Sequence, residues 1–117
     1  MANPENTPEA NAILQQLAQV IEQRKLADPS SSYVAALFAK GRGKIAQKIG
    51  EEGVEVALAA VGGHSEEIIA EMADLWFHSL VLLADANLSH QAVLNELAHR
   101  FGLSGLEEKA SRSNNPS

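Results

Sequence analysis

Residues 44–74 read KIAQKIGEEGVEVALAAVGGHSEEIIAEMAD, which is two helical segments separated by a pair of glycines. Five of the carboxylates on this stretch are expected to converge: Glu51, Glu52 and Glu55 on the first segment, Glu71 and Asp74 on the second. Their spacing places the three glutamates on one side of a helix that turns about 100° per residue. Apolar residues flank that side, so we expect it to face other protein rather than open solvent.

The link between the two segments contains Gly62 and Gly63, which predict a helix C-cap before a new helix opens at Ser65. So short a link makes the two helices antiparallel neighbours. Glu55 and Glu71 stand at similar distances from the turn, so the two sets of acids are expected to face each other. The second helix is apolar on almost every side, which is typical of a buried helix.

Clustered carboxylates repel one another by on the order of 1 to 4 kcal/mol per pair. Their convergence therefore requires protonation, basic neighbours or a divalent cation, and Lys44 and Lys48 could neutralise two acids at most. Oxygen ligands in a chain without cysteine favour a hard cation such as Mg²⁺. Each acidic motif alone is more often a solvated helix face. Their pairing on an apolar hairpin makes the metal site an equal alternative.

The composition excludes several classes of protein. With a formal net charge of -6 and a pI near 5.1, the chain lacks the basic surface that binds nucleic acid. Its lack of cysteine excludes disulfides and zinc thiolate sites. The first residues do not resemble a signal sequence, and no apolar run is long enough to cross a bilayer, so we expect a cytoplasmic protein.

The other segments also follow a helical period, and no stretch alternates as a strand does. The predicted order is a helix from Thr7-Pro8 to about residues 24–27, a loop over 28–32, a short helix over 33–39, a loop over 40–44, helices over 44–61 and 66–84, a turn over 85–88, a helix capped by Ser89 and ending near Gly102, and a last turn over 107–112. Residues 1–6 and 113–117 are expected to be frayed. We predict a single all-α domain over residues 1–117, a bundle of about four to five helices.

The predicted loop over residues 40–44, Lys40-Gly41-Arg42-Gly43-Lys44, combines three cations with two glycines. Glycine lets the backbone approach a ligand closely, and the cations would suit phosphate. A flexible, solvated connector is the commoner meaning of such a segment. Both interpretations stand on these residues alone.

His78 follows Asp74 by one helical turn, and we interpret it as a polar core residue or a partner of the acids rather than a metal ligand. Trp76 and Tyr33 are interpreted as core residues, with a base or ribose pocket as the alternative for Tyr33. Only three other substantial helices are available to cover the apolar helix over 66–84. A second copy of the chain is therefore expected to cover the rest.

Two motifs, Lys48-Ile-Gly-Glu-Glu-Gly-Val-Glu55 and Glu71-Met-Ala-Asp74, resemble the E-x-x-E and E-x-x-D signature of the all-α, MazG-like nucleoside triphosphate pyrophosphatases. Within that superfamily the chain resembles the phosphoribosyl-ATP pyrophosphohydrolases over roughly residues 10–112. The further motifs are Ser32-Tyr33, Leu37-Phe38-Ala39-Lys40-Gly41, Lys44-Ile45-Ala46-Gln47-Lys48 and Asp74-Leu75-Trp76-Phe77-His78. The resemblance implies a helical homodimer. It also implies Mg²⁺-dependent hydrolysis of the α-β phosphoanhydride of phosphoribosyl-ATP to phosphoribosyl-AMP and pyrophosphate, the second step of histidine biosynthesis.

The resemblance also implies roles position by position. The metal ligands would be Glu51 or Glu52, together with Glu55, Glu71 and Asp74. Glu51 or Glu52 would orient or deprotonate the attacking water, and Lys48 would reach phosphate. The residues that would bind substrate are Lys40, Arg42, Lys44, Lys48 and Tyr33. Gly43 departs from the family, which has a larger residue there. Two alternatives remain: a house-cleaning or dUTP-type pyrophosphatase acting on free nucleotides, and a non-catalytic helical dimerisation module.

Overall fold

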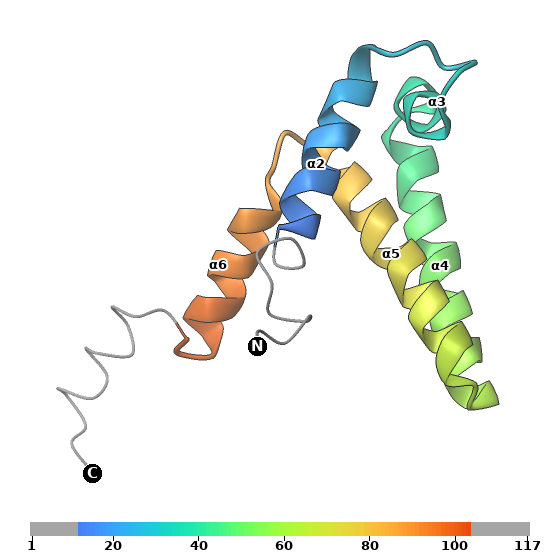
Figure 1. The fold of residues 1–117 in the computed structure, drawn as a ribbon, viewed down its shortest axis with the longest axis vertical. Helices are drawn as coiled ribbons and strands as arrows, with labels where there is room; N and C mark the ends of the chain where they lie inside the picture. Colours follow the sequence, from blue (N-terminus) through green and yellow to red (C-terminus); the bar gives the residue numbers. More distant parts are fainter. Residues whose placement is uncertain (1–11, 104–117) are drawn as a thin grey trace, which may run out of the picture.

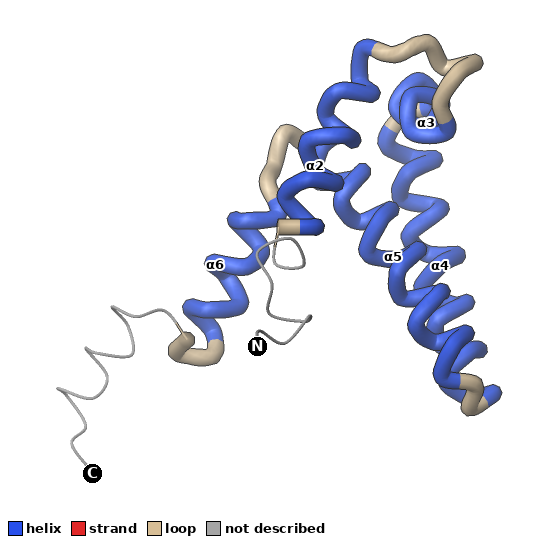
Figure 2. Tube along the Cα trace, in the orientation of Figure 1, coloured by secondary structure: helices blue, strands red, loops and turns tan. Residues whose placement is uncertain are grey.

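The structure is a computed structural model that describes residues 12–103, and all regular secondary structure in this range is helical (Figures 1 and 2). The elements are α2 (Ile13–Gln23), η2 (Arg24–Leu26), α3 (Tyr33–Lys40), α4 (Arg42–Gly62), α5 (Ser65–Asp85) and α6 (His90–Arg100). The predicted all-α fold is confirmed. The predictions for Thr7, for the last turn over 107–112 and for the frayed ends lie outside the described residues.

Helices α4 and α5 form the predicted antiparallel hairpin, which runs through the right-hand part of Figure 1. Gly63 ends α4 in the left-handed conformation, with φ 77°, and its N–H donates to the carbonyl oxygens of Ala59 and Ala60. This is the conformation in which glycine is favoured after a helix. The N-cap of α5 is His64 rather than Ser65, which is the first helical residue. The hairpin turn therefore fixes which residues of α4 and α5 face each other.

The predicted loop over residues 40–44 is wrong, because only Gly41 lies between α3 and α4. Gly41 has φ 97° and ψ 176°, so this single residue turns the chain. Its carbonyl oxygen accepts the N–H groups of Lys44 and Ile45 and thus begins α4. Ile45 is fully buried, and this packing holds the first turn of α4 in place. The burial of Ile45 therefore favours a helix over residues 42–45, although Gly41 and Gly43 suggest a flexible loop.

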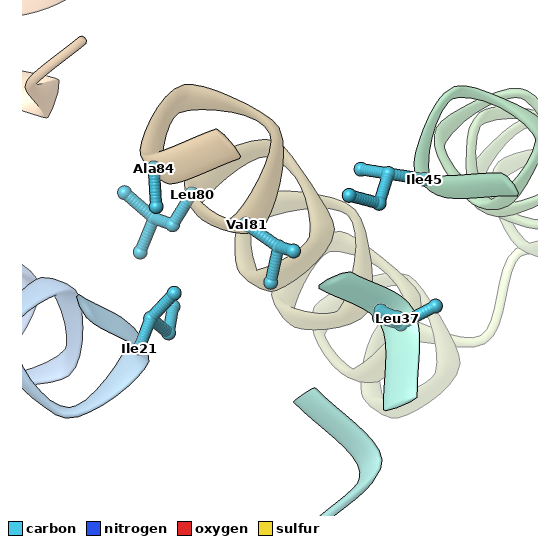
Figure 3. Packing of buried hydrophobic residues seen from close by; sticks show 6 residues of the cluster. All are labelled: Ile21, Leu37, Ile45, Leu80, Val81 and Ala84. Atoms are coloured by element: carbon cyan, nitrogen blue, oxygen red, sulfur yellow. The ribbon is translucent and has the colours of Figure 1, made fainter. Parts of the chain in front are cut away.

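The core lies where four helices meet, at the C-terminal end of α5. Figure 3 shows the buried cluster: Ile21 from α2, Leu37 from α3, Ile45 from α4, and Leu80, Val81 and Ala84 from α5. The first half of α5 lies outside this cluster and packs mainly against α4. The acidic residues lie on this outer half of the hairpin, so they are positioned by α4 and α5 alone.

Helix α6 begins at Ser89, whose hydroxyl oxygen accepts the N–H of Ala92, as the sequence predicts. It starts beside α2 and then runs away from the α4–α5 hairpin (Figure 1). No residue of α6 is buried. Within one chain, Ile69 and Trp76 of α5 remain 70% and 56% exposed. The prediction that Trp76 is a core residue is therefore wrong for a single chain. None of the described helices has the length and apolar content needed to cross a membrane.

Candidate metal and phosphate site

Three carboxylates from the two arms of the hairpin come together. Glu52 of α4 and Glu71 and Asp74 of α5 each place an oxygen so that the three oxygens lie within 4.8 Å of one another. We call these three residues the acidic trio. Glu71 and Asp74 face α4 together because residues three apart lie on one side of a helix. The two motifs, distant in sequence, meet because the turn at Gly63 makes α4 and α5 antiparallel.

Within the trio, the surroundings of Glu71 disfavour the charged form of its carboxyl. Burial raises the pKa of the Glu71 carboxyl, and the negative charges of Asp74, Glu55 and Glu52 raise it further. Within residues 12–103 no lysine or arginine forms an ion pair with any of the trio. Clustered acids that form no ion pair, two of them half-buried, favour either protonation or a bound cation.

The donor set fits a hard divalent cation. Mg²⁺ binds oxygens at about 2.0–2.1 Å in octahedral geometry, which sets adjacent ligand oxygens about 3 Å apart and opposite ones about 4.2 Å apart. The three oxygens of the trio lie within 4.8 Å of one another, close to the span of such a shell. Three carboxylates also leave coordination positions for water and phosphate, which Mg²⁺ sites in proteins commonly retain.

The two other acids of the sequence motif lie beside the trio rather than in it. Glu55 is close enough for its charge to raise the pKa of Glu71. Glu51 accepts a hydrogen bond from Gln47 Nε2 at 2.8 Å, and its carboxylate lies 3.4 Å from Lys48 Nζ. These contacts, first the Gln47 bond and then Lys48, lower the pKa of Glu51. Glu51 is therefore held along α4 as a stable carboxylate.

Lys48 and Tyr33 form a polar edge of the site on the side of α3. Negative charge on the Tyr33 phenol raises the pKa of Lys48, followed by the hydrogen bond to Glu51. Among the described residues, the ion-pair partner of Lys48 is Glu51. Lys48 is therefore a positive charge held next to the acids.

His78 is buried, with 5% of its surface exposed, as the sequence interpretation expects. Its Nε2 lies 2.8 Å from the Tyr33 hydroxyl, and its Nδ1 lies 2.8 Å from the backbone carbonyl oxygen of Asp74. Tyr33 is 53% exposed, so its interpretation as a core residue is wrong. The spacing of Asp74 and His78 by one turn signals this contact in the sequence. Nothing local in the sequence signals the contact with Tyr33, which is 45 residues away.

The cations of the predicted loop are not gathered around the trio. Arg42 donates from Nε to Asp85 Oδ2 at 2.8 Å and from Nη2 to the Asp85 carbonyl oxygen at 3.1 Å. Asp85 ends α5, about 16 Å along the helix from Asp74 at about 1.5 Å per residue. Lys44 lies close enough to Glu51 for its charge to help lower the pKa of that carboxyl. Lys40 is exposed at the end of α3.

Comparison with known proteins gives concordant matches over most of the chain. The profile of the family described as phosphoribosyl-ATP pyrophosphohydrolase matches residues 14–101. A protein of Methylococcus capsulatus strain Bath, described as phosphoribosyl-ATP pyrophosphatase, is 55% identical over 100 residues. That alignment covers 86% of this chain and 95% of the relative. The profile match spans the whole acidic trio as well as Lys48, Tyr33 and His78.

Proposed function

Because the chain belongs to the phosphoribosyl-ATP pyrophosphohydrolase family, it hydrolyses phosphoribosyl-ATP to phosphoribosyl-AMP and pyrophosphate in histidine biosynthesis, and we propose that it does so with Mg²⁺ held by the acidic trio. The observation that carries the metal is the meeting of three carboxylates, none of which forms an ion pair with a lysine or arginine among the described residues. A triphosphate adds further negative charge to such a site. The carboxylates of the trio and the phosphates repel each other unless a cation lies between them.

Bound Mg²⁺ would supply charge neutralisation and polarise the phosphate oxygens. The other tasks fall to the chain's own residues. Glu52, Glu71 and Asp74 hold the cation, with Glu55 beside Glu71 as a further ligand. Glu51 is kept ionised by Gln47 and Lys48 and is placed to orient or deprotonate the attacking water. Glu52 has the same chemistry and is the alternative base.

The basic residues would contact the phosphates. Lys48, a fixed positive charge at neutral pH, would take up charge on the departing pyrophosphate. Lys44 in the first turn of α4 and Lys40 at the end of α3 would add further positive charge for the phosphates. Arg42 joins them only by exchanging its bonds to Asp85 for bonds to phosphate. Tyr33 stands beside Lys48 as the remaining substrate contact.

We further propose that the enzyme is a cytoplasmic homodimer. An apolar groove of about 450 Å³ lies between α2, α5 and α6 and is lined by residues that include Leu14, Trp76, Val93 and Leu97. The exposed Ile69 extends the apolar surface along α5. A stable interface removes about 800 Å² from each partner, and a continuous apolar face on two helices suits a second copy of the chain.

Pyrophosphate release from phosphoribosyl-ATP, compared with ATP, dUTP and other free nucleoside triphosphates, tests the proposal. Each substrate is assayed with Mg²⁺ and with excess EDTA. We expect turnover of phosphoribosyl-ATP that far exceeds every free nucleotide and that stops in EDTA. Preference for a free nucleotide would instead identify a house-cleaning enzyme. Turnover that survives EDTA would refute the metal, and no turnover of any substrate would leave a dimerisation module.

A further inference from the structure

A buried histidine connects the backbone of the acidic trio to a hydroxyl on another helix. His78 of α5 contacts the Asp74 carbonyl oxygen through Nδ1 and the Tyr33 hydroxyl through Nε2, each at 2.8 Å. We propose that His78 is a positioning residue that holds the Tyr33 hydroxyl as a hydrogen-bond acceptor for a ribose hydroxyl of the substrate. This inference rests on the proposed function and identifies which part of the substrate Tyr33 recognises.

The direction of both hydrogen bonds follows from the chemistry of the partners. A carbonyl oxygen only accepts, so Nδ1 of His78 carries the hydrogen and donates to Asp74. A neutral imidazole has one N–H, so Nε2 is an acceptor and the Tyr33 O–H donates to it. The only hydrogen of the Tyr33 hydroxyl is then in use. What remains on this oxygen is its lone pairs, which accept hydrogen bonds.

As an acceptor, the Tyr33 hydroxyl oxygen binds only hydrogen-bond donors of the substrate. Phosphate oxygens are themselves acceptors at neutral pH, so they gain nothing from the Tyr33 oxygen. Ribose hydroxyls are donors, and phosphoribosyl-ATP carries them on both of its sugars. Lys48 is also a donor, but among the described residues its ammonium makes no hydrogen bond to the Tyr33 hydroxyl and pairs with Glu51 at 3.4 Å. The two residues of the polar edge therefore bind different parts of the substrate: Lys48 of α4 contacts phosphate and Tyr33 of α3 contacts ribose.

The surroundings keep this arrangement rigid on one side and open on the other. The His78 ring packs edge-on against Tyr33 and Phe77, with ring centroids 5.8 Å and 5.1 Å apart. Tyr33 is the first residue of α3, whose N-cap Ser32 accepts the N–H of Ala35. The backbone of Tyr33 is thus fixed by a capped helix and its hydroxyl by a buried ring. The 53% exposure of Tyr33 leaves it accessible to a substrate.

The first test removes either partner of the proposed contact. Wild-type enzyme and Tyr33→Phe are assayed with phosphoribosyl-ATP and with analogues that each lack one ribose hydroxyl. A neutral hydrogen bond contributes about 0.5–1.5 kcal/mol, so we expect Tyr33→Phe to raise KM by about 2- to 10-fold with little change in kcat. With wild-type enzyme, the KM of one deoxy analogue should exceed that of phosphoribosyl-ATP by the same factor. With Tyr33→Phe, removal of that ribose hydroxyl should cause no further increase in KM.

The ribose contact would be refuted if each missing hydroxyl raised KM by the same factor in wild type and in Tyr33→Phe. An unchanged KM in Tyr33→Phe would also refute it. A loss in kcat alone would also overturn it, since Tyr33 would then act on the attacking water or a phosphate. Failure of wild-type enzyme to hydrolyse phosphoribosyl-ATP is a separate result that refutes the proposed function itself.

The second test asks whether His78 acts through Tyr33. His78→Phe removes the acceptor, and His78→Gln restores an amide oxygen within reach of the Tyr33 hydroxyl. We expect His78→Phe to raise KM by the same factor as Tyr33→Phe, His78→Gln to recover part of it, and the Tyr33→Phe/His78→Phe double variant to show no added effect on KM. Additive effects on KM would refute positioning through Tyr33. Urea denaturation of each variant separates stability from binding, and the Tyr33→Phe test stands even if His78→Phe does not fold.

Discussion

Two glycines that are two residues apart should respond in opposite directions to alanine. Gly41 has φ 97° and ψ 176°, a conformation almost restricted to glycine that costs other residues on the order of 1–3 kcal/mol. A Cβ at Gly41 would meet no atom within 4 Å, so the cost there is backbone strain and not a clash. Gly43 is the second residue of α4, again with open space around an added Cβ. Alanine is favoured over glycine in a helix by about 0.5–1 kcal/mol.

We therefore expect Gly41→Ala to lower the free energy of unfolding by about 1–3 kcal/mol and Gly43→Ala, in the first turn of α4, to raise it by at most about 0.5–1 kcal/mol. Each kcal/mol corresponds to about 4–8 °C in Tm for a small domain. Urea denaturation followed by circular dichroism measures both changes. The protomer concentration must be the same in all samples, because oligomerisation makes stability depend on concentration.

The sign of the Gly43 effect decides between two descriptions of this segment. A flexible glycine loop, which the sequence alone suggests, predicts no stabilisation by Gly43→Ala. A helix that begins at Arg42 predicts stabilisation. If Gly43→Ala destabilises the protein as much as Gly41→Ala, or if neither changes its stability, the reasoning about the α3–α4 connection is refuted.

Three further perturbations test the site and the assembly. Glu71→Gln should abolish turnover yet stabilise the metal-free protein at neutral pH, because the raised pKa of Glu71 marks a carboxylate that the folded state holds at a cost. This gain over wild type should shrink as pH falls through the raised pKa towards that of an unfolded glutamate; a gain independent of pH would contradict it. Mg²⁺ at about 100 times its Kd should add about 2.7 kcal/mol to the free energy of unfolding, and a Tm indifferent to both Mg²⁺ and EDTA would count against the site. Trp76→Glu should convert the dimer into monomers in sedimentation experiments, because it places a charge on the apolar face of α5, and a variant that still sediments as a dimer would place the interface elsewhere.

The hairpin could be predicted from the sequence because its signals are local. Helical periods, the glycine pair before Ser65 and the acids in the first turn of α5 each act within a few residues. Once the turn at Gly63 is known, antiparallel packing brings Glu52 to Glu71 and Asp74 without further information. The meeting of the two acidic motifs thus follows from spacing alone.

The errors have a different origin, because each depends on contacts between distant residues. The start of α4 is fixed by burial of Ile45 in a core to which four helices contribute. Arg42 is drawn away from the trio by Asp85, 43 residues later, where α5 ends. Tyr33 is held by His78, 45 residues away. Neither charge patterns nor glycine content reports such contacts, so these residues could be identified as candidates but not placed.

Isothermal titration of Mg²⁺ into the metal-free protein tests the central claim most directly. Wild type is compared with Glu52→Gln, Glu71→Gln and Asp74→Asn, which keep side-chain size while removing one charge from the trio. Glu66→Gln is the matched control, since Glu66 lies on the same helix as Glu71 and Asp74 but outside the trio. We predict that wild type and the control bind Mg²⁺ alike and that each trio variant binds at least about tenfold more weakly, as expected when a metal site is disrupted. Equal affinity in all five proteins, or no binding by wild type, would contradict a metal site at Glu52, Glu71 and Asp74.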